Sequence, residues 1–153
     1  MKVIHALLLL VVTLPLSVSR GDPLMLWYSK PGKTPMTEGL PIGNGRLGAL
    51  LLGGVEQDRI VLNEDSLWTG NENPSGDYDS MGAYQMLGEL VINLSAKENF
   101  SAYRRTLDLD DALATVSYQM AGVRYEREFF CSHPSGLFVA KFSADKPGQY
   151  SGT

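Results

Sequence analysis

Apolar and polar residues alternate along most of the chain, and this pattern predicts β-strands. In residues 113–120, apolar side chains at every second position alternate with Thr, Ser and Gln. Such alternation is typical of a strand whose sheet is solvated on one face. Comparable segments, separated by turns rich in Gly, Pro, Asn and Asp, are residues 24–28, 89–94, 103–109, 123–131 and 137–142. The predicted fold class is therefore mainly β, an antiparallel β-sandwich.

Residues 40–70 predict a β-hairpin with polar residues gathered at one end. Residues 47–52 form an apolar run of strand length, Gly53-Gly54 interrupts it, and residues 59–62 resume with aliphatic and β-branched side chains. Antiparallel pairing brings the start of one strand beside the finish of the next. The residues expected at this shared end are Asn44, Arg46, Asn63, Glu64, Asp65 and Trp68.

The glycines of this hairpin match the spacing G-x-G-x-x-G of a dinucleotide-binding loop. A dinucleotide-binding loop follows a β-strand, but only residues 40–42 precede the first glycine, which is too few for that strand. Residues 33–41, with two prolines, are expected to form an extended connector. Gly53-Gly54 then follows too soon for a crossover helix. The glycines are better explained by turns that need positive φ or close backbone approach.

The first 19 residues predict a cleaved secretory signal peptide. Lys2 and His5 precede an apolar run over residues 6–16, and small residues follow at 17–19. The run is too short for a bilayer, which needs about 20 residues; a buried or anchoring N-terminal helix is the alternative. Residues 24–153 then form one domain, which stops as a further strand begins and is expected to be incomplete at its C-terminus. Secretion is the expected localisation.

Composition narrows the classes of partner and cofactor. The formal charge is −4 and there is no run of Lys or Arg, so neither nucleic acid nor a membrane is an expected partner. Cys131 is the only cysteine, which rules out an internal disulfide and suggests a buried thiol. Clustered metal ligands are missing from the pattern, and the aspartates of residues 108–111 suggest a solvated face rather than a calcium site. No metal and no cofactor is expected.

Two sequence motifs fit a secreted protein. Asn93-Leu94-Ser95 and Asn99-Phe100-Ser101 both match N-x-[ST], the acceptor sequence for N-glycosylation. Asn73-Pro74-Ser75 is excluded by its proline. Asn93 and Asn99 are therefore the predicted glycosylation sites.

Glu64, Asp65 and Trp68 are the residues of this chain whose side chains best suit contact with a sugar. Glycoside hydrolysis uses two carboxyl groups, and a tryptophan face often supports a sugar ring. Adjacent residues of a regular strand point to opposite faces, so Glu64 and Asp65 cannot both address one bond. Two interpretations stay open: Asn63 and Asp65 hold the turn while Trp68 fills the edge of the core, or part of this cluster contacts sugar. The candidate substrate-binding residues are Asn44, Arg46, Asn63, Glu64 and Trp68.

The segments LPIGNGRLGA (40–49) and LNEDSLWTG (62–70), followed by YRRTLDLDD (103–111), resemble the N-terminal domain of glycoside hydrolase family 95, the secreted α-L-fucosidases and related α-L-galactosidases. The resemblance implies a β-supersandwich that packs against an (α/α)6 barrel. It also implies inverting hydrolysis of fucosyl or galactosyl residues of glycans, with the catalytic groups in the barrel. No catalytic residue can therefore be placed in this chain, which alone should be inactive.

The connection between Gly70 and Tyr84 is shorter than in many members of that family, which leaves the strand order around residues 84–94 open.

Two other functions are considered as alternatives. The chain could be a stand-alone carbohydrate-binding sandwich without hydrolase activity, or a purely structural domain. Sugar contact by Trp68 distinguishes the first of these from the second.

Overall fold

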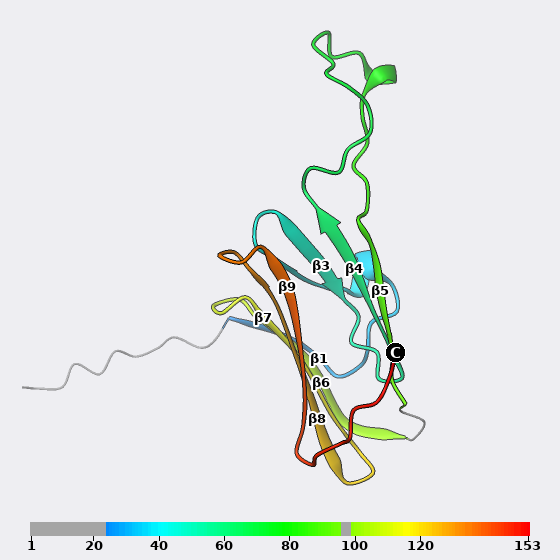
Figure 1. Ribbon diagram of the computed structural model, residues 1–153, viewed down its shortest axis with the longest axis vertical. Coiled ribbons are helices and arrows are strands. Elements are labelled where there is room, and N and C mark those ends of the chain that lie inside the picture. Colours follow the sequence, from blue (N-terminus) through cyan, green and yellow to red (C-terminus); the bar gives the residue numbers. More distant parts are fainter. Residues whose placement is uncertain (1–23, 96–98) are drawn as a thin grey trace, which may run out of the picture.

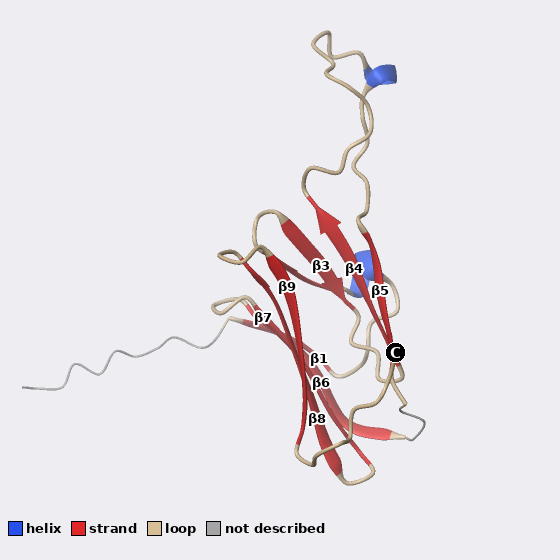
Figure 2. Ribbon diagram, viewed as in Figure 1, coloured by secondary structure: helices blue, strands red, loops and turns tan. Residues whose placement is uncertain are grey.

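The computed structural model describes residues 24–95 and 99–153, and it shows two antiparallel sheets packed face to face (Figure 1, Figure 2). The five-stranded sheet has the order β1 (Met25–Tyr28), β6 (Phe100–Asp108), β7 (Leu113–Met120), β8 (Val123–Ser132), β9 (Leu137–Ala144). The four-stranded sheet has the order β2 (Leu40–Gly43), β3 (Leu47–Leu51), β4 (Gln57–Glu64), β5 (Gly88–Asn93). The predicted mainly β, antiparallel sandwich is confirmed.

The strands predicted from alternation are present. β7 has the predicted bounds, β1, β5, β8 and β9 differ from prediction by a few residues, and β6 begins earlier, at Phe100. The predicted hairpin is also confirmed, because β3 pairs with β4 in a register that sets Leu47 opposite Glu64. Within the described residues, no helix has the length and apolarity that a membrane span requires. The predicted signal peptide, residues 1–19, lies outside the described residues.

The extended connector predicted for residues 33–41 is wrong. Residues Pro35–Glu38 form the one-turn helix α1, in which proline stands at the start of the helix, where its missing N–H is no loss. β2 then follows directly and pairs with β3. Pro41 is tolerated because β2 is an edge strand. A short strand therefore precedes the glycine motif, but the residues after it form a β-turn and β3 without a helix, which is no dinucleotide-binding unit.

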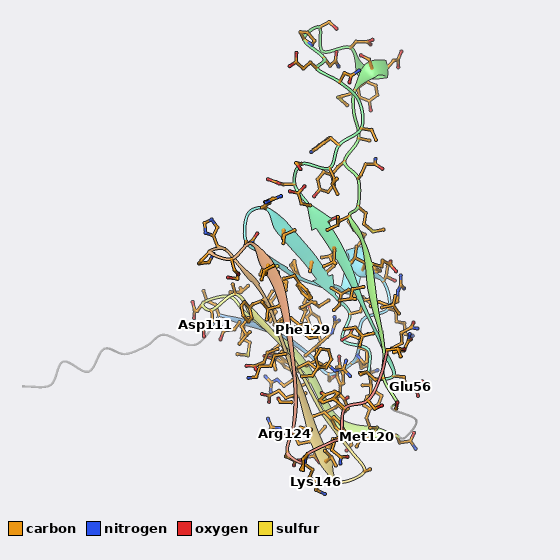
Figure 3. All side chains as sticks on the ribbon, in the orientation of Figure 1. Glu56, Asp111, Met120, Arg124, Phe129 and Lys146 are labelled. Atoms are coloured by element: carbon orange, nitrogen blue, oxygen red, sulfur yellow. The ribbon has the colours of Figure 1, made fainter. Side chains whose placement is uncertain are left out.

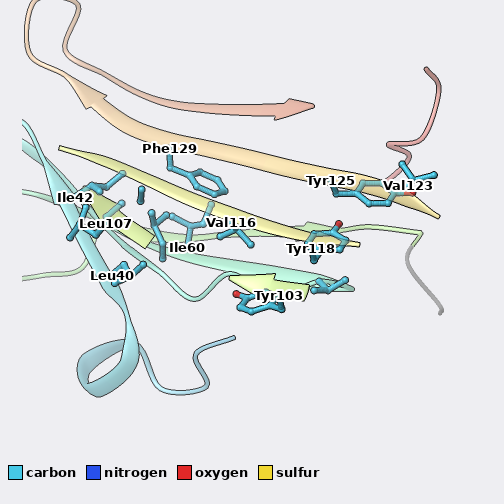
Figure 4. Close-up of a cluster of buried hydrophobic side chains, with 14 residues drawn as sticks. Leu40, Ile42, Ile60, Tyr103, Leu107, Val116, Tyr118, Val123, Tyr125 and Phe129 are labelled. Atoms are coloured by element: carbon cyan, nitrogen blue, oxygen red, sulfur yellow. The ribbon is translucent and has the colours of Figure 1, made fainter. Parts of the chain in front are cut away.

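The core lies between the inner faces of the two sheets. Every second residue of β7 and β8 points inward, and Phe129 lies fully buried between the layers (Figure 3). Tyr118 and Tyr125 stack with ring centroids 5.0 Å apart (Figure 4). Cys131 packs against this cluster and is only partly buried, so the predicted thiol site is more open than expected. Burial raises the pKa of the Cys131 thiol.

A buried ion pair joins the two sheets. Arg127 of β8 and Asp58 of β4 are both almost fully buried, with Nη1 to Oδ2 at 2.9 Å. Asp58 Oδ1 also accepts from the N–H groups of Gly53 and Gly54, while Arg127 donates to the carbonyls of Gly54 and Val55. Gly53 has φ +70°, and a Cβ there would meet the Tyr103 hydroxyl. The Gly53-Gly54 turn is therefore held by both members of the pair.

Residues 65–87 leave the sandwich between β4 and β5 as an arm that extends beyond the end of the sheet (Figure 1). A β-bridge between Trp68 and Tyr84, together with hydrogen bonds of the Thr69 hydroxyl to Ala83, joins the two sides of the arm, which contains η1 (Tyr78–Ser80) near its tip. Its large apolar side chains are exposed. The arm therefore has no core of its own.

Removal of one member of the buried ion pair should be strongly destabilising. Asp58→Ala leaves the Arg127 guanidinium buried without its anion and two turn N–H groups without an acceptor, and we expect a loss of about 3–5 kcal/mol of unfolding free energy. Urea denaturation near neutral pH measures it. The control Arg124→Ala removes an exposed pair with Glu126 and should cost less than about 1 kcal/mol. Equal losses in the two variants would contradict the role of the buried pair.

Candidate functional site

The candidate residues predicted from sequence gather at one end of the four-stranded sheet, which we call the rim. Three segments build the rim: the β2–β3 turn (residues 44–46), the end of β4 with the turn after it (residues 63–68), and the β8–β9 turn (residues 133–136). An open pocket of about 600 Å³ lies between the first and third segments. Its wall includes Asn44 and Arg46, which were predicted, and His133, which was not.

Asn44 is a positioning residue. Its Oδ1 accepts from the N–H groups of Arg46 and Leu47 at 3.1 and 2.8 Å, which closes the β2–β3 turn. Its Nδ2 donates to the carbonyl of Ser132 at 2.9 Å and so joins the two sheets. With these groups engaged, Asn44 shapes the pocket, and its amide is committed to the protein.

Glu64 is the electrostatic centre of the rim. Its Oε1 accepts from Arg46 Nε at 2.8 Å, and its Oε2 accepts from the N–H and the hydroxyl of Ser66 at 3.0 and 2.5 Å. The Ser66 hydroxyl, with Arg46 next in effect, lowers the pKa of Glu64 to about 2. Glu64 is therefore held as a carboxylate whose oxygens accept hydrogen bonds from Arg46 and Ser66.

Arg46 is the cation of the rim, and most of its side chain is exposed to solvent. Its side chain is 74% exposed, and only Nε is engaged, by Glu64. The Glu64 hydrogen bond raises the pKa of Arg46 further. Both Nη groups lack a hydrogen-bond partner among the described residues, which leaves them available to sugar hydroxyls or an acidic group.

Trp68 is exposed, which excludes the interpretation that it fills the edge of the core. Its side chain is 61% exposed, and its Nε1 donates to the carbonyl of Asp65 at 3.0 Å. Tyr84 lies edge-on to the indole with centroids 5.3 Å apart, and its hydroxyl donates to the carbonyl of Glu64. The side chains of Glu64 and Tyr84 hold this turn, and Asp65 contributes through its backbone N–H and carbonyl. Trp68 presents an aromatic surface beside the rim.

Asn63 does not join this cluster. It is the neighbour of Glu64 on β4 and therefore points to the opposite face of the sheet. The predicted set is thus divided: Asn44, Arg46 and Glu64 are connected by hydrogen bonds, Trp68 lies beside them through Tyr84, and Asn63 faces away. Ser66, Tyr84 and His133 were missed, because their roles depend on a local turn and on segments distant in sequence.

The remaining candidates have structural explanations. Asp108 accepts from the N–H groups of Asp110 and Asp111, which closes the β6–β7 turn. Across residues 24–95 and 99–153, no three His, Cys, Asp or Glu side chains cluster as metal ligands. Asn93 and Asn99 are both exposed, and their glycosylation stays a prediction. Within the described chain, the rim can therefore bind through the cation of Arg46, the imidazole of His133 and the indole of Trp68.

The Glu64 network predicts a pH-dependent contribution to stability. Because the folded pKa is about 2, below the ordinary value of about 4.3, the contribution is present above the unfolded pKa and is lost as pH falls toward 2. The excess melting temperature of the native chain over Glu64→Gln should therefore be constant above about pH 5 and shrink below it. Thermal unfolding at a series of pH values measures this. Asp65→Asn, which removes none of these hydrogen bonds, should stay near native stability, and a pH-independent Glu64→Gln difference would contradict the network.

Comparison with known proteins identifies the N-terminal domain of a glycosyl hydrolase. The profile of the glycosyl hydrolase family 65 N-terminal domain matches residues 26–83 and 73–152. Alpha-L-fucosidase 2 of Arabidopsis thaliana is 34% identical over 165 residues, covering 84% of this chain and 19% of the relative. Probable alpha-fucosidase A of Aspergillus niger is 31% identical, covering 78% of this chain and 20% of the relative.

A protein of the same name from Aspergillus oryzae is 26% identical over 78% of the chain. The chain spans about a fifth of the length of these relatives. The Arabidopsis alignment is longer than the part of this chain that it covers, so the relative has additional residues within the matched region. The profile match extends over nearly all of the described residues, and the chain belongs to the family of glycosyl hydrolase family 65 N-terminal domains.

Proposed function

We propose that the chain is the non-catalytic N-terminal domain of a secreted inverting glycoside hydrolase of family 95, which acts on α-L-fucosyl or α-L-galactosyl residues of glycans. The observation that carries this proposal is the similarity to alpha-fucosidases, of which the chain matches about a fifth. The motifs LPIGNGRLGA and LNEDSLWTG support family 95 in particular. The domain boundaries are then a signal peptide over residues 1–19 and the β-domain over residues 24–153.

The rim supports a binding role over a catalytic one. Glu64 is held as a carboxylate by Arg46 and Ser66, and Asp65 lies in the turn after β4, where its backbone carbonyl accepts from Trp68 Nε1. A glycosidase needs a protonated carboxyl group and a second carboxylate across one bond. The rim has no such pair, so the catalytic groups belong to another domain. Arg46, His133 and Trp68 can still contribute one wall of a sugar site.

Exposed apolar surface supports packing of this domain against a second one. The arm carries exposed Tyr78, Met81, Met86 and Leu87, and β1 with the residue before it is exposed from Leu24 to Trp27. Contiguous apolar surface is uncommon on a monomeric domain and is typical of an interface. We assign these two surfaces to contact with the proposed (α/α)6 barrel.

The hydrolase activity should reside in the longer protein. Expressed from its full transcript in a secreting eukaryotic host, the protein should release fucose from a fucosylated oligosaccharide, and the β anomer should appear first, because inversion converts the α linkage. Proton NMR of the fresh reaction identifies the anomer. The secreted product should begin near Arg20 on N-terminal sequencing.

The chain of residues 1–153 is the matched control and should release no fucose. Activity of this chain alone would contradict the non-catalytic assignment. Release of the α anomer first by the longer protein would contradict inversion, and a protein retained in the cell with residues 1–19 intact would contradict secretion.

A stand-alone carbohydrate-binding module is the second candidate, favoured by the exposed indole of Trp68. In that case the chain of residues 1–153 should itself bind a fucosylated oligosaccharide, and Trp68→Ala should weaken binding by roughly tenfold or more, as expected for loss of an aromatic contact. Isothermal titration calorimetry measures both. Trp27→Ala is the matched control, because Trp27 is equally exposed and lies on β1. Equal effects of the two substitutions would exclude a sugar site at Trp68.

A further inference from the structure

A second cavity, of about 420 Å³, lies away from the rim. Strand β3 begins at the rim with Leu47, and its other end lies near this cavity. There the N–H of Gly32, which stands between the wall residues Pro31 and Lys33, donates to the carbonyl of Leu52. We call it the basic cavity, because its wall includes Lys30, Lys33 and Arg105. Five residues of strand, about 16 Å, separate it from the rim.

Arg105 is a buried cation without an anionic partner. It lies on β6, is 3% exposed, and donates through Nε to the carbonyl of Lys30 at 3.0 Å and through Nη1 to the carbonyls of Glu38 and Leu51 at 2.5 and 3.4 Å. These acceptors are neutral, and no carboxylate of the described residues forms an ion pair with Arg105. Nη2 has no hydrogen bond among them. A guanidinium in this setting retains an unused donor, and its charge interacts with the nearby Glu38 carboxylate without forming an ion pair with it.

The rest of the wall is cationic as well. Lys30 and Lys33 are exposed and form no ion pair with any described residue. Glu38 is the one carboxylate of the wall, and its Oε2 accepts from the backbone N–H groups of Lys33 and Thr34. Those hydrogen bonds lower the pKa of Glu38, with a smaller contribution from Arg105. Three cations against one committed carboxylate make a local excess of positive charge in a chain of net charge −4.

Tyr28 gives the cavity an aromatic side. The Arg105 guanidinium lies 4.7 Å from the centroid of the Tyr28 ring, and Tyr28 is 45% exposed. A planar donor beside an exposed ring suits an oxyanion that is attached to a sugar ring, since the guanidinium binds the anion and the aromatic surface packs against carbon atoms. The volume accommodates one such residue.

We propose that the basic cavity binds the carboxylate or sulfate group of an acidic saccharide, with Arg105 Nη2 as the donor that faces the cavity and Lys30 and Lys33 as flanking cations. The anion site stands on the geometry of the cavity alone, and only its assignment to a saccharide rests on the proposed function. Its position identifies it as separate from the rim.

Three related sugars test the proposal on the full chain: galacturonic acid, galactose 6-sulfate and neutral galactose. At low ionic strength, at least one acidic sugar should bind, and its amide NMR shifts should centre on residues 30–38, whereas galactose should not bind. Binding of only one acidic sugar identifies the anion as carboxylate or sulfate. High salt should weaken the binding, because the flanking lysines are exposed to solvent.

The double variant Lys30→Gln/Lys33→Gln separates charge recognition from folding, because both lysines are exposed. It should weaken binding by roughly tenfold or more while the melting temperature stays native. Lys146→Gln, in a loop at the end of β9 (Figure 3), is the control of equal chemistry and should bind as the native chain does. Arg105→Lys keeps the charge, loses the fork, and should also weaken binding.

Four outcomes would overturn the proposal: equal binding of galactose and the acidic sugars, unchanged binding in the double lysine variant, loss of binding in Arg46→Gln at the rim, or no binding of either acidic sugar. None of them bears on fucose release by the longer protein. Failure of the basic cavity and failure of the proposed hydrolase are therefore distinguishable.

Discussion

The ion pair between Arg127 and Asp58 determines how the two sheets sit on one another. Each side chain comes from a different sheet, and each is buried where an unpaired charge would be very unfavourable. Arg127 also stacks near the Tyr118 and Phe142 rings, so its position is defined from several sides. A one-residue slip of β4 or β8 within its own sheet would turn Asp58 or Arg127 to the other face and leave its partner unpaired.

The same two strands both end at the rim, so the buried pair also helps to position the candidate site. Asp58 and Glu64 are six residues apart on β4 and share its inner face. Arg127 and Ser132 lie on β8, and the carbonyl of Ser132 accepts from the Asn44 side chain across the sheets. The buried pair holds β4 near its start and β8 near its middle, and both strands run from there to the rim. Glu64 is therefore presented to Arg46 and Ser66 in one arrangement, which is what keeps it ionised.

Alternation in the sequence predicted most strands because apolar residues occupy the inner positions, and the hairpin argument correctly brought Arg46 to Glu64. β2 was missed because Pro41 interrupts a four-residue strand that is still alternately buried. Arg127 shares the phase of Tyr125 and Phe129, which marks it as an inner residue, but its partner is 69 residues away and no local pattern identifies it. Tyr84 was missed at the rim for the same reason. Local patterns specify strands and faces, whereas long-range polar partners depend on the complete fold.

Arg105 and Arg127 show that burial alone does not explain an inner arginine. Both lie on the core face of the five-stranded sheet; Arg105 donates to the carbonyl of Leu51 in β3, and Arg127 to that of Gly54 in the β3–β4 turn. Arg127 has a carboxylate within 3 Å and lies deep in the core, whereas Arg105 has only neutral acceptors and lines an open cavity. A structural role would be met by the first arrangement, in which the charge is neutralised inside the protein. The second leaves a charge and a donor facing solvent-accessible space, which is the arrangement expected where the anion comes from a ligand.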